Sequence, residues 1–312
     1  MKKRSAFTLI ELVMVIVVFG IIASIGAEII TKMYENYLRT RAINRLQSQT
    51  EITLEQVAKR LQYRIKDSVR ASNDNGASWR ALPNAIAGYD TIEWIGISNE
   101  SFLGEHNGTS VVPGWSGLID LDNPKTAFLA QTLETPGSRL DFANNTIKAL
   151  TNNTVAMDGT AVKFPAIIFK GTKIGTFANY YPPTPTFTNR ITCQAFNCNN
   201  VSTFSTPNGL GDLDGDGNGD LFEQYYLAHS AYALAPVGAA DDFNLTLYYN
   251  YQPWEGETYT PNGTPTVLAE HVSTFRIRQD GDSIRIKLCI HDANQSIASN
   301  FDFSACKEKV IY

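Results

Sequence analysis

Residues 5–27 read SAFTLIELVMVIVVFGIIASIGA, an apolar run that contains a single ionisable side chain, Glu11. As a helix, residues 7–27 would extend about 30 Å, which matches the hydrocarbon thickness of a bilayer. A basic triplet, KKR at residues 2–4, stands before the run. By the positive-inside rule, we expect the N-terminus to stay in the cytoplasm and everything after Ala27 to lie outside it.

The carboxylate of Glu11 is the unusual feature of this run, because a charged side chain at bilayer depth costs roughly 2.5–3.5 kcal/mol by insertion scales. A secretory signal that is later removed is an alternative interpretation. Such a signal has an apolar core of about 7–15 residues, followed by small residues at the cleavage site. Here the run is longer and the small residues Ser5 and Ala6 precede it, so we favour a retained membrane helix.

The composition of the 312 residues, with 43% hydrophobic and 18% charged side chains, is that of an ordinary globular protein. The formal net charge is −5 although three basic residues stand together at the N-terminus, so the body of the protein is acidic. Nucleic-acid binding relies on clustered Lys and Arg. We therefore do not expect nucleic acid as a main partner.

A helical pattern continues beyond the membrane segment, through residues 28–70. Apolar side chains recur there at three- and four-residue spacing, and no Pro or Gly interrupts residues 27–75. We expect one helix from residue 7 to about residue 69, which is longer than any bilayer is thick. Its protruding half needs a cover, either the protein's own sheet or neighbouring copies, for the apolar side chains Ile30, Met33, Tyr34, Tyr37, Leu38, Leu54, Val57, Leu61 and Ile65.

Residues 76–312 are expected to form a β-rich head outside the cytoplasm. Short β-like runs are separated there by Gly, Pro and Asn: TIEWIGIS (91–98), GLIDL (117–121), AIIFK (166–170) and NLTLYYNY (244–251). The clearest hairpin is TFRIRQDGDSIRIKLCI (274–290), in which apolar and charged residues alternate around Asp280-Gly281. These patterns predict an α+β fold in which the helical stripe at residues 54–65 covers an antiparallel sheet. Residues 172–239 interrupt the β pattern and are interpreted as a loop-rich insertion.

Four cysteines agree with an exported, oxidising location. Cys193 and Cys198 lie close together, and Cys289 and Cys306 flank the last loop. Three pairings are open, and we favour the two local ones, since each closes a short, loop-rich stretch. Four unpaired thiols are the alternative; a zinc site is less well supported, because the cysteines have no recognisable ligand spacing.

The opening SAFTLIELVMVIVVFGIIA resembles the N-terminal segment of type IV pilins and type II secretion pseudopilins. The resemblance rests on the basic leader, the small residue before Phe7, the block TLIEL, and Glu11 as the fifth residue after the expected cut. It implies that a prepilin peptidase removes residues 1–6, cutting between Ala6 and Phe7, and methylates the new N-terminus. This chain has Ala6 where the family usually has Gly. The resemblance also gives Glu11 a role, as the partner of the freed Phe7 amine on an adjacent subunit.

Three further features favour a minor pilin or minor pseudopilin of the W or J type. Glu28 stands where pilins often carry Pro, the chain is long for a pilin, and residues 267–290 loosely resemble the closing hairpin of those subunits. The partners implied are other subunits, the prepilin peptidase, an inner-membrane assembly platform and lipid. The implied location is the inner membrane before assembly, and a periplasmic or cell-surface filament after it.

The sequence GDLDGDGNGDLFEQYY at residues 211–226 satisfies the spacing of a calcium-binding loop. Carboxylate and carbonyl oxygens at alternate positions of a tight loop can point at one centre, and Ca²⁺ prefers six to eight oxygens. We expect a lone calcium loop rather than a paired EF-hand, with an Asp-rich surface turn as the alternative. The expected ligands are Asp212, Asp214, Asp216, Asn218, Asp220 and Glu223.

No catalytic residue is expected. The four histidines, His106, His229, His271 and His291, are scattered, with no H-x-x-x-H pair and no nucleophile motif. The function that we expect is therefore a structural filament subunit and not an enzyme. The alternative is a membrane-tethered, calcium-binding receptor, adhesin or enzyme domain.

Overall fold

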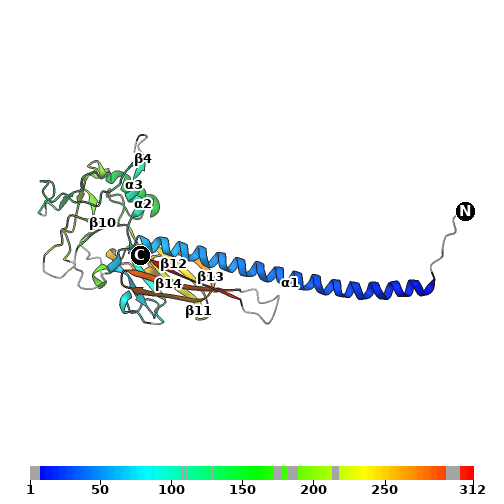
Figure 1. Ribbon diagram of the computed structural model, residues 1–312. Coiled ribbons are helices and arrows are strands. Elements are labelled where there is room, and N and C mark those ends of the chain that lie inside the picture. The colour runs from blue at the N-terminus through cyan, green and yellow to red at the C-terminus, as the bar shows by residue number, and fades with distance from the viewer. Residues whose placement is uncertain are drawn as a thin grey trace.

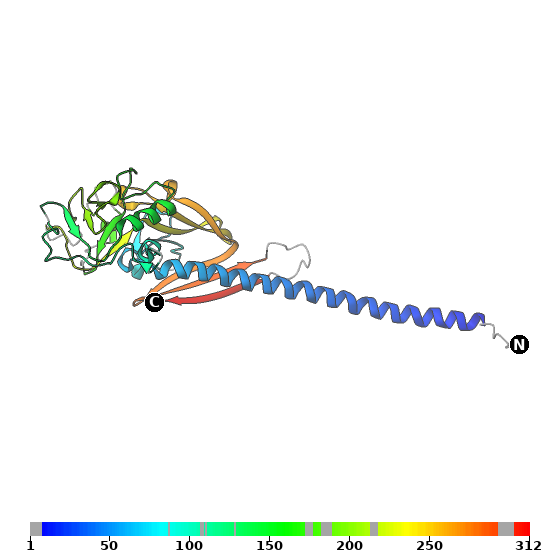
Figure 2. The same cartoon turned by 90° about the horizontal axis from the view of Figure 1, so that it is seen from above.

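A single helix of 54 residues, α1 (Leu9–Gln62), extends far beyond the rest of the chain in both views (Figures 1 and 2). The structure is a computed structural model that describes residues 8–86, 88–106, 109, 111–127, 129–171, 177–181, 189–212, 218–292 and 303–312. The head lies at the C-terminal end of α1, and the helix with its antiparallel sheet confirms the expected α+β fold.

The buried side chains of α1 all lie in its last third. No side chain between Leu9 and Arg45 is buried, and Leu46 is the first that is. From there the buried positions recur at helical spacing, as the sequence predicts for this face; they are Leu46, Thr50, Thr53, Leu54, Val57, Ala58 and Leu61. The apolar stripe at Ile30, Met33, Tyr34 and Tyr37 is exposed, so the protein's own sheet does not cover it.

The helix ends at Gln62, earlier than the end expected near residue 69. The next residues leave the helix because their backbone pairs with the end of strand β3 (Thr91–Gly96). Ile65 N–H donates to the Ile95 carbonyl over 2.9 Å, and Ile97 N–H donates to the Tyr63 carbonyl over 2.7 Å. The apolar side chain of Ile65 is still buried, but from an extended segment and not from the helix.

The main sheet has eight strands in the order β15-β14-β13-β12-β11-β3-β1-β2, and every neighbouring pair is antiparallel. One face of it forms the principal core with α1. Lys307 on β15 pairs with Glu51 on α1 at 2.6 Å, and Lys309 pairs with Glu55. Besides β3, the strands are β1 (Arg70–Ser72), β2 (Arg80–Ala81), β11 (Ser230–Ala239), β12 (Asp242–Tyr251), β13 (Thr264–Asp280), β14 (Ser283–His291) and β15 (Ser304–Ile311).

The hairpin β13–β14 forms as the sequence predicts, with Ile277 opposite Ile286. Because Asp280 pairs with Ser283, the two central turn residues are Gly281 and Asp282. Gly281 has φ 58°. A positive φ at the first central residue is the conformation that favours Gly in a two-residue hairpin turn.

The insertion lies between β3 and β11, which are neighbours in the sheet, so its bounds differ from the expected 172–239. Ser230–Ala239 is a central strand, β11, and not part of the insertion. Pro236 lies within this strand. Pro has no backbone N–H to donate to a neighbouring strand. It is tolerated here because β3 pairs only with Ser230–Leu234 and does not extend to Pro236.

The insertion has its own hydrophobic core and forms the part of the head farthest from the start of α1 (Figures 1 and 2). The expected strand at residues 117–121 is only an isolated bridge, Leu118 to Gln224. The insertion contains α2 (Asn99–Leu103), β4 (Glu105–His106), β5 (Val111–Val112), β6 (Thr132–Glu134), α3 (Leu140–Leu150), β7 (Ala166–Phe169), β8 (Thr192–Cys193), β9 (Thr203–Ser205) and β10 (Tyr225–Ala228). Helix α4 (Tyr259–Asn262) follows β12, and the short 3-10 turns are Lys66–Ser68, Leu82–Asn84, Phe177–Tyr180, Phe196–Cys198 and Pro253–Glu255.

A third core joins the insertion to the sheet, because β3 and β11 are buried on both faces. Ile92 and Leu234 face the α1 core, whereas Ile95 and Ala233 face the strands β7 and β10. Trp254 is fully buried in this third core.

A buried ion pair stands on the insertion-facing side of β3. The Arg70 guanidinium donates to Glu93 Oε2 through Nε at 2.6 Å and lies 2.5 Å away through Nη2. Tyr251 OH donates to Glu93 Oε1 at 2.7 Å, and Glu93 is fully buried. The guanidinium also lies 3.5 Å from the ring centroid of Tyr181. Each oxygen of the carboxylate therefore has a donor.

Arg70→Met is expected to destabilise the head by about 3–5 kcal/mol, because it removes one partner and leaves Glu93 as an uncompensated buried charge. The measurement is denaturant unfolding of the full chain in detergent. Arg80→Met, on the neighbouring strand, is the matched control, since Arg80 is exposed. Equal free energies of unfolding for the two variants would contradict this role of Arg70.

His229, at the junction of β10 and β11, is expected to make stability depend on pH. Its ring is buried, with Nδ1 2.8 Å from Ser98 Oγ, and burial lowers its pKa to about 4. Between about pH 6.5 and 4 the unfolded chain binds a proton that the folded chain does not. Stability is therefore lost as the pH falls, by up to about 3 kcal/mol from this group. His229→Asn should flatten the slope of unfolding free energy against pH in that window; an unchanged slope counts against the assignment.

Candidate functional site

The N-terminus of α1 is built around Glu11. Thr8 is the N-cap residue, its hydroxyl accepts from Glu11 N–H at 3.4 Å, and Glu11 Oε2 accepts from Thr8 N–H at 3.1 Å. This reciprocal arrangement is a capping box, which satisfies backbone donors that have no partner within the helix. The sequence signal for it, T-x-x-E before an apolar run, stands in the block TLIE at residues 8–11.

The surroundings of Glu11 are apolar and uncovered. Leu9, Ile10 and Leu12 are 82%, 72% and 56% exposed, and the helix is long and apolar enough to cross a membrane. Glu11 is also exposed, so its carboxylate can be reached from outside the subunit while it caps the helix. Ala6 and Phe7, the expected cleavage site, lie outside the described residues.

The candidate calcium loop lies between β9 and β10 in the insertion. Asp214 and Asp216 lie outside the described residues, whereas Asp212, Asn218, Asp220 and Glu223 lie within them. The two ends of the loop meet, since Asp220 N–H donates to the Gly211 carbonyl at 2.9 Å. Gly211 N–H in turn donates to Oδ1 of the fully buried Asn189 at 2.6 Å. The base of the loop is thus fixed to the insertion.

The described donors suit calcium in their chemistry. Asp220 is buried, whereas Asp212, Asn218 and Glu223 are exposed. All four supply oxygen, the ligand atom that Ca²⁺ prefers, and buried carboxylates require a compensating cation or hydrogen bonds. Strand β10 begins two residues after Glu223, whose carbonyl accepts from Ile119 N–H at 2.7 Å. A strand therefore follows the loop, where an EF-hand would have a helix.

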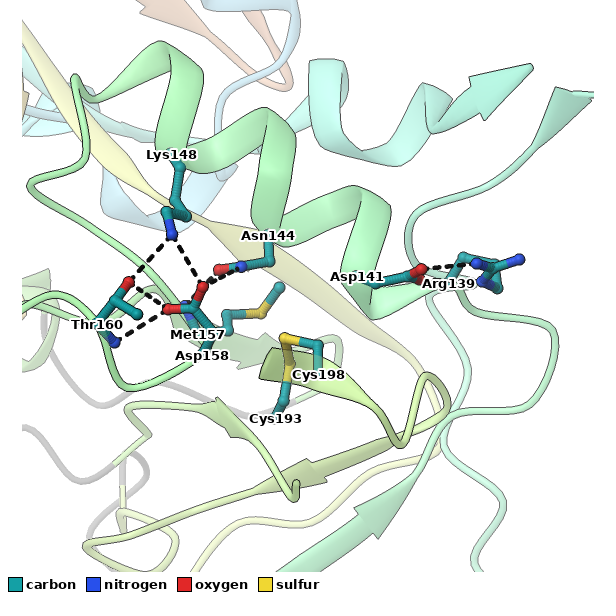
Figure 3. The surroundings of a disulfide bond; sticks show 9 residues. All are labelled: Arg139, Asp141, Asn144, Lys148, Met157, Asp158, Thr160, Cys193 and Cys198. Carbon is teal, nitrogen blue, oxygen red and sulfur yellow. Dashed lines mark hydrogen bonds and ion pairs between the residues drawn. A yellow bond between two sulfur atoms is a disulfide. The ribbon is translucent and has the colours of Figure 1, made fainter. Parts of the chain in front are cut away.

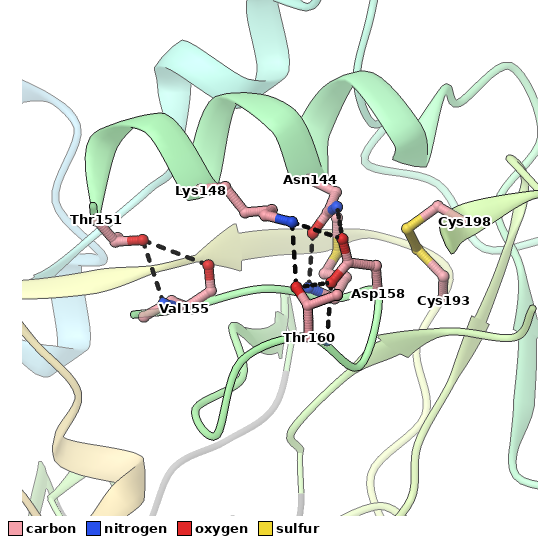
Figure 4. Close-up of polar contacts among 9 residues, drawn as sticks. Asn144, Lys148, Thr151, Val155, Asp158, Thr160, Cys193 and Cys198 are labelled. Atoms are coloured by element: carbon pink, nitrogen blue, oxygen red, sulfur yellow. Dashed lines mark hydrogen bonds and ion pairs between the residues drawn. A yellow bond between two sulfur atoms is a disulfide. The ribbon is translucent and has the colours of Figure 1, made fainter. Parts of the chain in front are cut away.

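A buried carboxylate, Asp158, connects α3 to the following loop (Figure 4). Its Oδ2 accepts from Asn144 Nδ2 at 2.8 Å and from Lys148 Nζ at 3.0 Å, and its Oδ1 accepts from Thr160 N–H at 3.0 Å. Burial by itself would raise the pKa of Asp158, but these hydrogen bonds together hold it below the usual range. Asn144 and Lys148 are one helical turn apart on α3, so the network fixes the loop to one face of that helix.

Both favoured cysteine pairings are present. Cys193 and Cys198 form a disulfide in the insertion, and Cys289 and Cys306 form one between β14 and β15. The first lies beside α3 and the Asp158 network (Figure 3), and Cys193 N–H donates to the Met157 carbonyl at 2.9 Å. The second joins directly paired residues of the last two strands. The disulfides thus reinforce the insertion and the edge of the main sheet separately.

The histidines have different surroundings. His229 is buried at the base of the insertion, and the side chain of His106 lies outside what the structure describes. His271 and His291 come together with Asp242, although the sequence separates each pair of these residues by 20 or more positions. No local spacing in the sequence indicates this association, because the three residues belong to different strands.

Comparison with known proteins bears on the N-terminal segment. A family model described as the prokaryotic N-terminal methylation motif matches residues 1–27. No curated protein and no solved structure matched the chain. The matched segment leads directly into the long apolar helix that stands on the antiparallel sheet. The chain thus carries the prepilin-type methylation motif, and with its long apolar helix it fits a type IV pilin or pseudopilin.

Proposed function

We propose that this protein is a minor pilin or minor pseudopilin of the W or J type, a structural subunit and not an enzyme. It is stored in the inner membrane and then assembled into an extracytoplasmic filament with other pilin-type subunits. The observation that carries the proposal is the uncovered N-terminal part of α1, in which no side chain from Leu9 to Arg45 is buried and Glu11 lies among apolar neighbours.

That part of α1 is too long for a membrane anchor alone. Residues 9–45 extend about 55 Å at standard helical rise, against about 30 Å of hydrocarbon. Lipid can cover the first half, but Met33, Tyr34 and Tyr37 lie beyond it and are 67%, 61% and 59% exposed. A continuous row of exposed apolar side chains of this kind marks an interaction surface. Neighbouring helices of the same kind would cover the whole length at once.

Glu11 would act in two ways within this scheme. In the single subunit it caps the helix through Thr8, which reduces the cost of holding a carboxylate in lipid. In the filament it would pair with the cleaved, positively charged N-terminus of a neighbouring subunit, as the family resemblance implies. Capping requires only hydrogen bonding, whereas pairing requires the negative charge, so the two roles can be separated by substitution.

Glu11→Gln is expected to abolish incorporation into filaments, because Gln keeps the hydrogen-bonding geometry of a capping box but removes the charge. Thr8→Ala should have the opposite effects: it should weaken the helix cap by about 0.5–2 kcal/mol, but filaments should still form. The measurement is the share of the protein in the sheared filament fraction of cells that contain the assembly machinery.

Glu28→Ala serves as a control, since Glu28 is an exposed acid on the same helix that pairs with Lys32 at 2.6 Å. Such surface pairs contribute little, so this variant should assemble. If Glu11→Gln assembled as well as Glu28→Ala, the charge of Glu11 would have no role in assembly.

The minor type is supported by features of the helix and the head. Helix α1 continues through Glu28 without a break, so the position where pilins often carry Pro does not loosen here. The insertion lies at the far end of the head, away from the start of α1 (Figure 2). In a filament with α1 along its axis, the insertion would point toward the tip of the filament, which suits an initiating or tip subunit.

We further propose that the loop at residues 212–223 binds Ca²⁺ as a structural ion. It would be held by Asp212, Asp214, Asp216, Asn218, Asp220 and Glu223, and it would neutralise this acidic cluster. The support is the closed base of the loop and the all-oxygen donor set described above. Isolated loops in extracellular proteins bind Ca²⁺ at roughly 10⁻⁴–10⁻³ M.

Added Ca²⁺ is expected to raise the melting temperature of the chelator-stripped full chain in detergent. At about ten times the dissociation constant, the gain is about 1.4 kcal/mol. Glu223→Gln should remove the response, and Asp122→Asn, which changes an exposed acid elsewhere in the insertion, should keep it. If added Ca²⁺ left the melting temperature of the unchanged protein the same, the ion would be ruled out as a stabilising group.

The second candidate is a membrane-tethered receptor, adhesin or enzyme domain, and the insertion favours it, because a large extra domain with its own core can serve a head function. In that case α1 would be only a tether. The Glu11→Gln variant separates the candidates, since a tethered domain would keep its activity and its membrane location.

A further inference from the structure

The residues Asp242, His271 and His291 come together from three adjacent strands. Their ligand-type atoms all lie within 4.8 Å of one another. His271 Nδ1 is 3.0 Å from Asp242 Oδ1, and His291 Nε2 is 3.6 Å from the same oxygen. We refer to these three residues as the His-Asp cluster. It belongs neither to the candidate calcium loop nor to the assembly helix.

The fold builds the cluster by departing from regular strand pairing. Phe243, Val272 and Ile290 form a row across β12, β13 and β14, and each cluster residue is the sequence neighbour of one of them. The register shifts beside this row in both strand pairs. His271 also has φ 56°, a left-handed conformation that is uncommon outside Gly. Bulges and such residues gather where a fold aims a side chain at a functional site.

The cluster has the donor set of a transition-metal site. Two imidazoles and one carboxylate suit Zn²⁺, whereas Ca²⁺ prefers an all-oxygen set. Ligand atoms around a tetrahedral Zn²⁺ are about 3.3 Å apart, given bonds of about 2.0–2.1 Å. The two distances to Asp242 Oδ1, 3.0 and 3.6 Å, lie on either side of this value, and the ligand atoms of the two histidines are no more than 4.8 Å apart.

The burial of the cluster agrees with a three-ligand site. The side chains of Asp242, His271 and His291 are 50%, 41% and 15% exposed, which leaves one side of the centre open for a water ligand. His291 Nδ1 is buried and has no hydrogen-bond partner among the described residues. His291 Nε2 faces Asp242 at 3.6 Å, and a metal bound at Nε2 would fix the tautomer and the orientation of the ring.

We propose that Asp242, His271 and His291 bind one Zn²⁺ ion, which cross-links β12, β13 and β14. The site lies at the end of the sheet beside the uncovered part of α1. Asp292 N–H donates to the Phe303 carbonyl at 3.0 Å, and the Arg39 guanidinium lies 5.0 Å from the Phe303 ring. At the same end Cys289 and Cys306 join β14 to β15. Metal and disulfide would together connect four consecutive strands of the sheet.

The test measures Zn²⁺ binding to the full chain in detergent, with Ca²⁺ saturating so that the calcium loop does not compete. A chromophoric chelator reports affinity and stoichiometry, and Co²⁺ as a substitute probe reports the ligand set by its absorption bands. We expect one Zn²⁺ per chain, with a dissociation constant at or below about 1 µM. Removal of a ligand should weaken binding more than the 10–100-fold typical for loss of a supporting hydrogen bond.

The variants are Asp242→Asn and His271→Gln, whose side chains are exposed enough that the fold should not depend on them. Asp241→Asn is the matched control, because it makes the same change at an exposed acid one residue away. The proposal holds if the first two lose the bound Zn²⁺ and the control keeps it. It is overturned if the unchanged protein takes up no Zn²⁺, or if Asp242→Asn and His271→Gln bind it as tightly as Asp241→Asn.

Discussion

The apolar N-terminal part of α1 cannot be buried by the fold to which it is attached. The head buries side chains of α1 only from Leu46 onward, and the apolar side chains from Leu9 to Tyr37 are exposed. At about 25 cal/mol for each Å² of apolar surface, so much uncovered area strongly favours lipid or neighbouring helices over water. The head, in contrast, buries its own apolar side chains. Its strands β3 and β11 are covered on both faces, by α1 on one side and by the insertion on the other. One helix therefore joins a self-sufficient head to a segment that needs partners.

Much of this architecture could be predicted from the sequence, because it depends on local patterns. The apolar run, the buried stripe at Leu54, Val57 and Leu61, the β13–β14 hairpin and both disulfides follow from periodicity, turn residues and cysteine spacing. The methylation motif is equally local, and the family match at residues 1–27 agrees with it. These are the features for which neighbours in sequence are also neighbours in space.

The features that could not be predicted depend on distant pairing. The helix ends at Gln62 because the chain after it pairs with β3, about thirty residues away, and nothing at residues 63–69 breaks a helix locally. Strand β11 was included in the predicted insertion at residues 172–239, and only its pairing with the distant strand β3, in addition to β12, makes it a central strand of the sheet. The His-Asp cluster requires three strands and two register shifts. The candidate calcium loop differs from these features, because its ligand spacing is entirely local. Two of its expected ligands, Asp214 and Asp216, lie outside the described residues.

The central claim is that α1 is the membrane-stored assembly helix of a processed subunit. The most direct test is the intact mass of the protein isolated from the membranes of cells that contain a prepilin peptidase, together with its N-terminal residue. A chain that lacks residues 1–6 and begins with methylated Phe7 is the result that the account predicts. A chain that still begins at Met1, or one that is cut after the apolar run, would contradict it, because Glu11 would then have no cleaved N-terminus to meet.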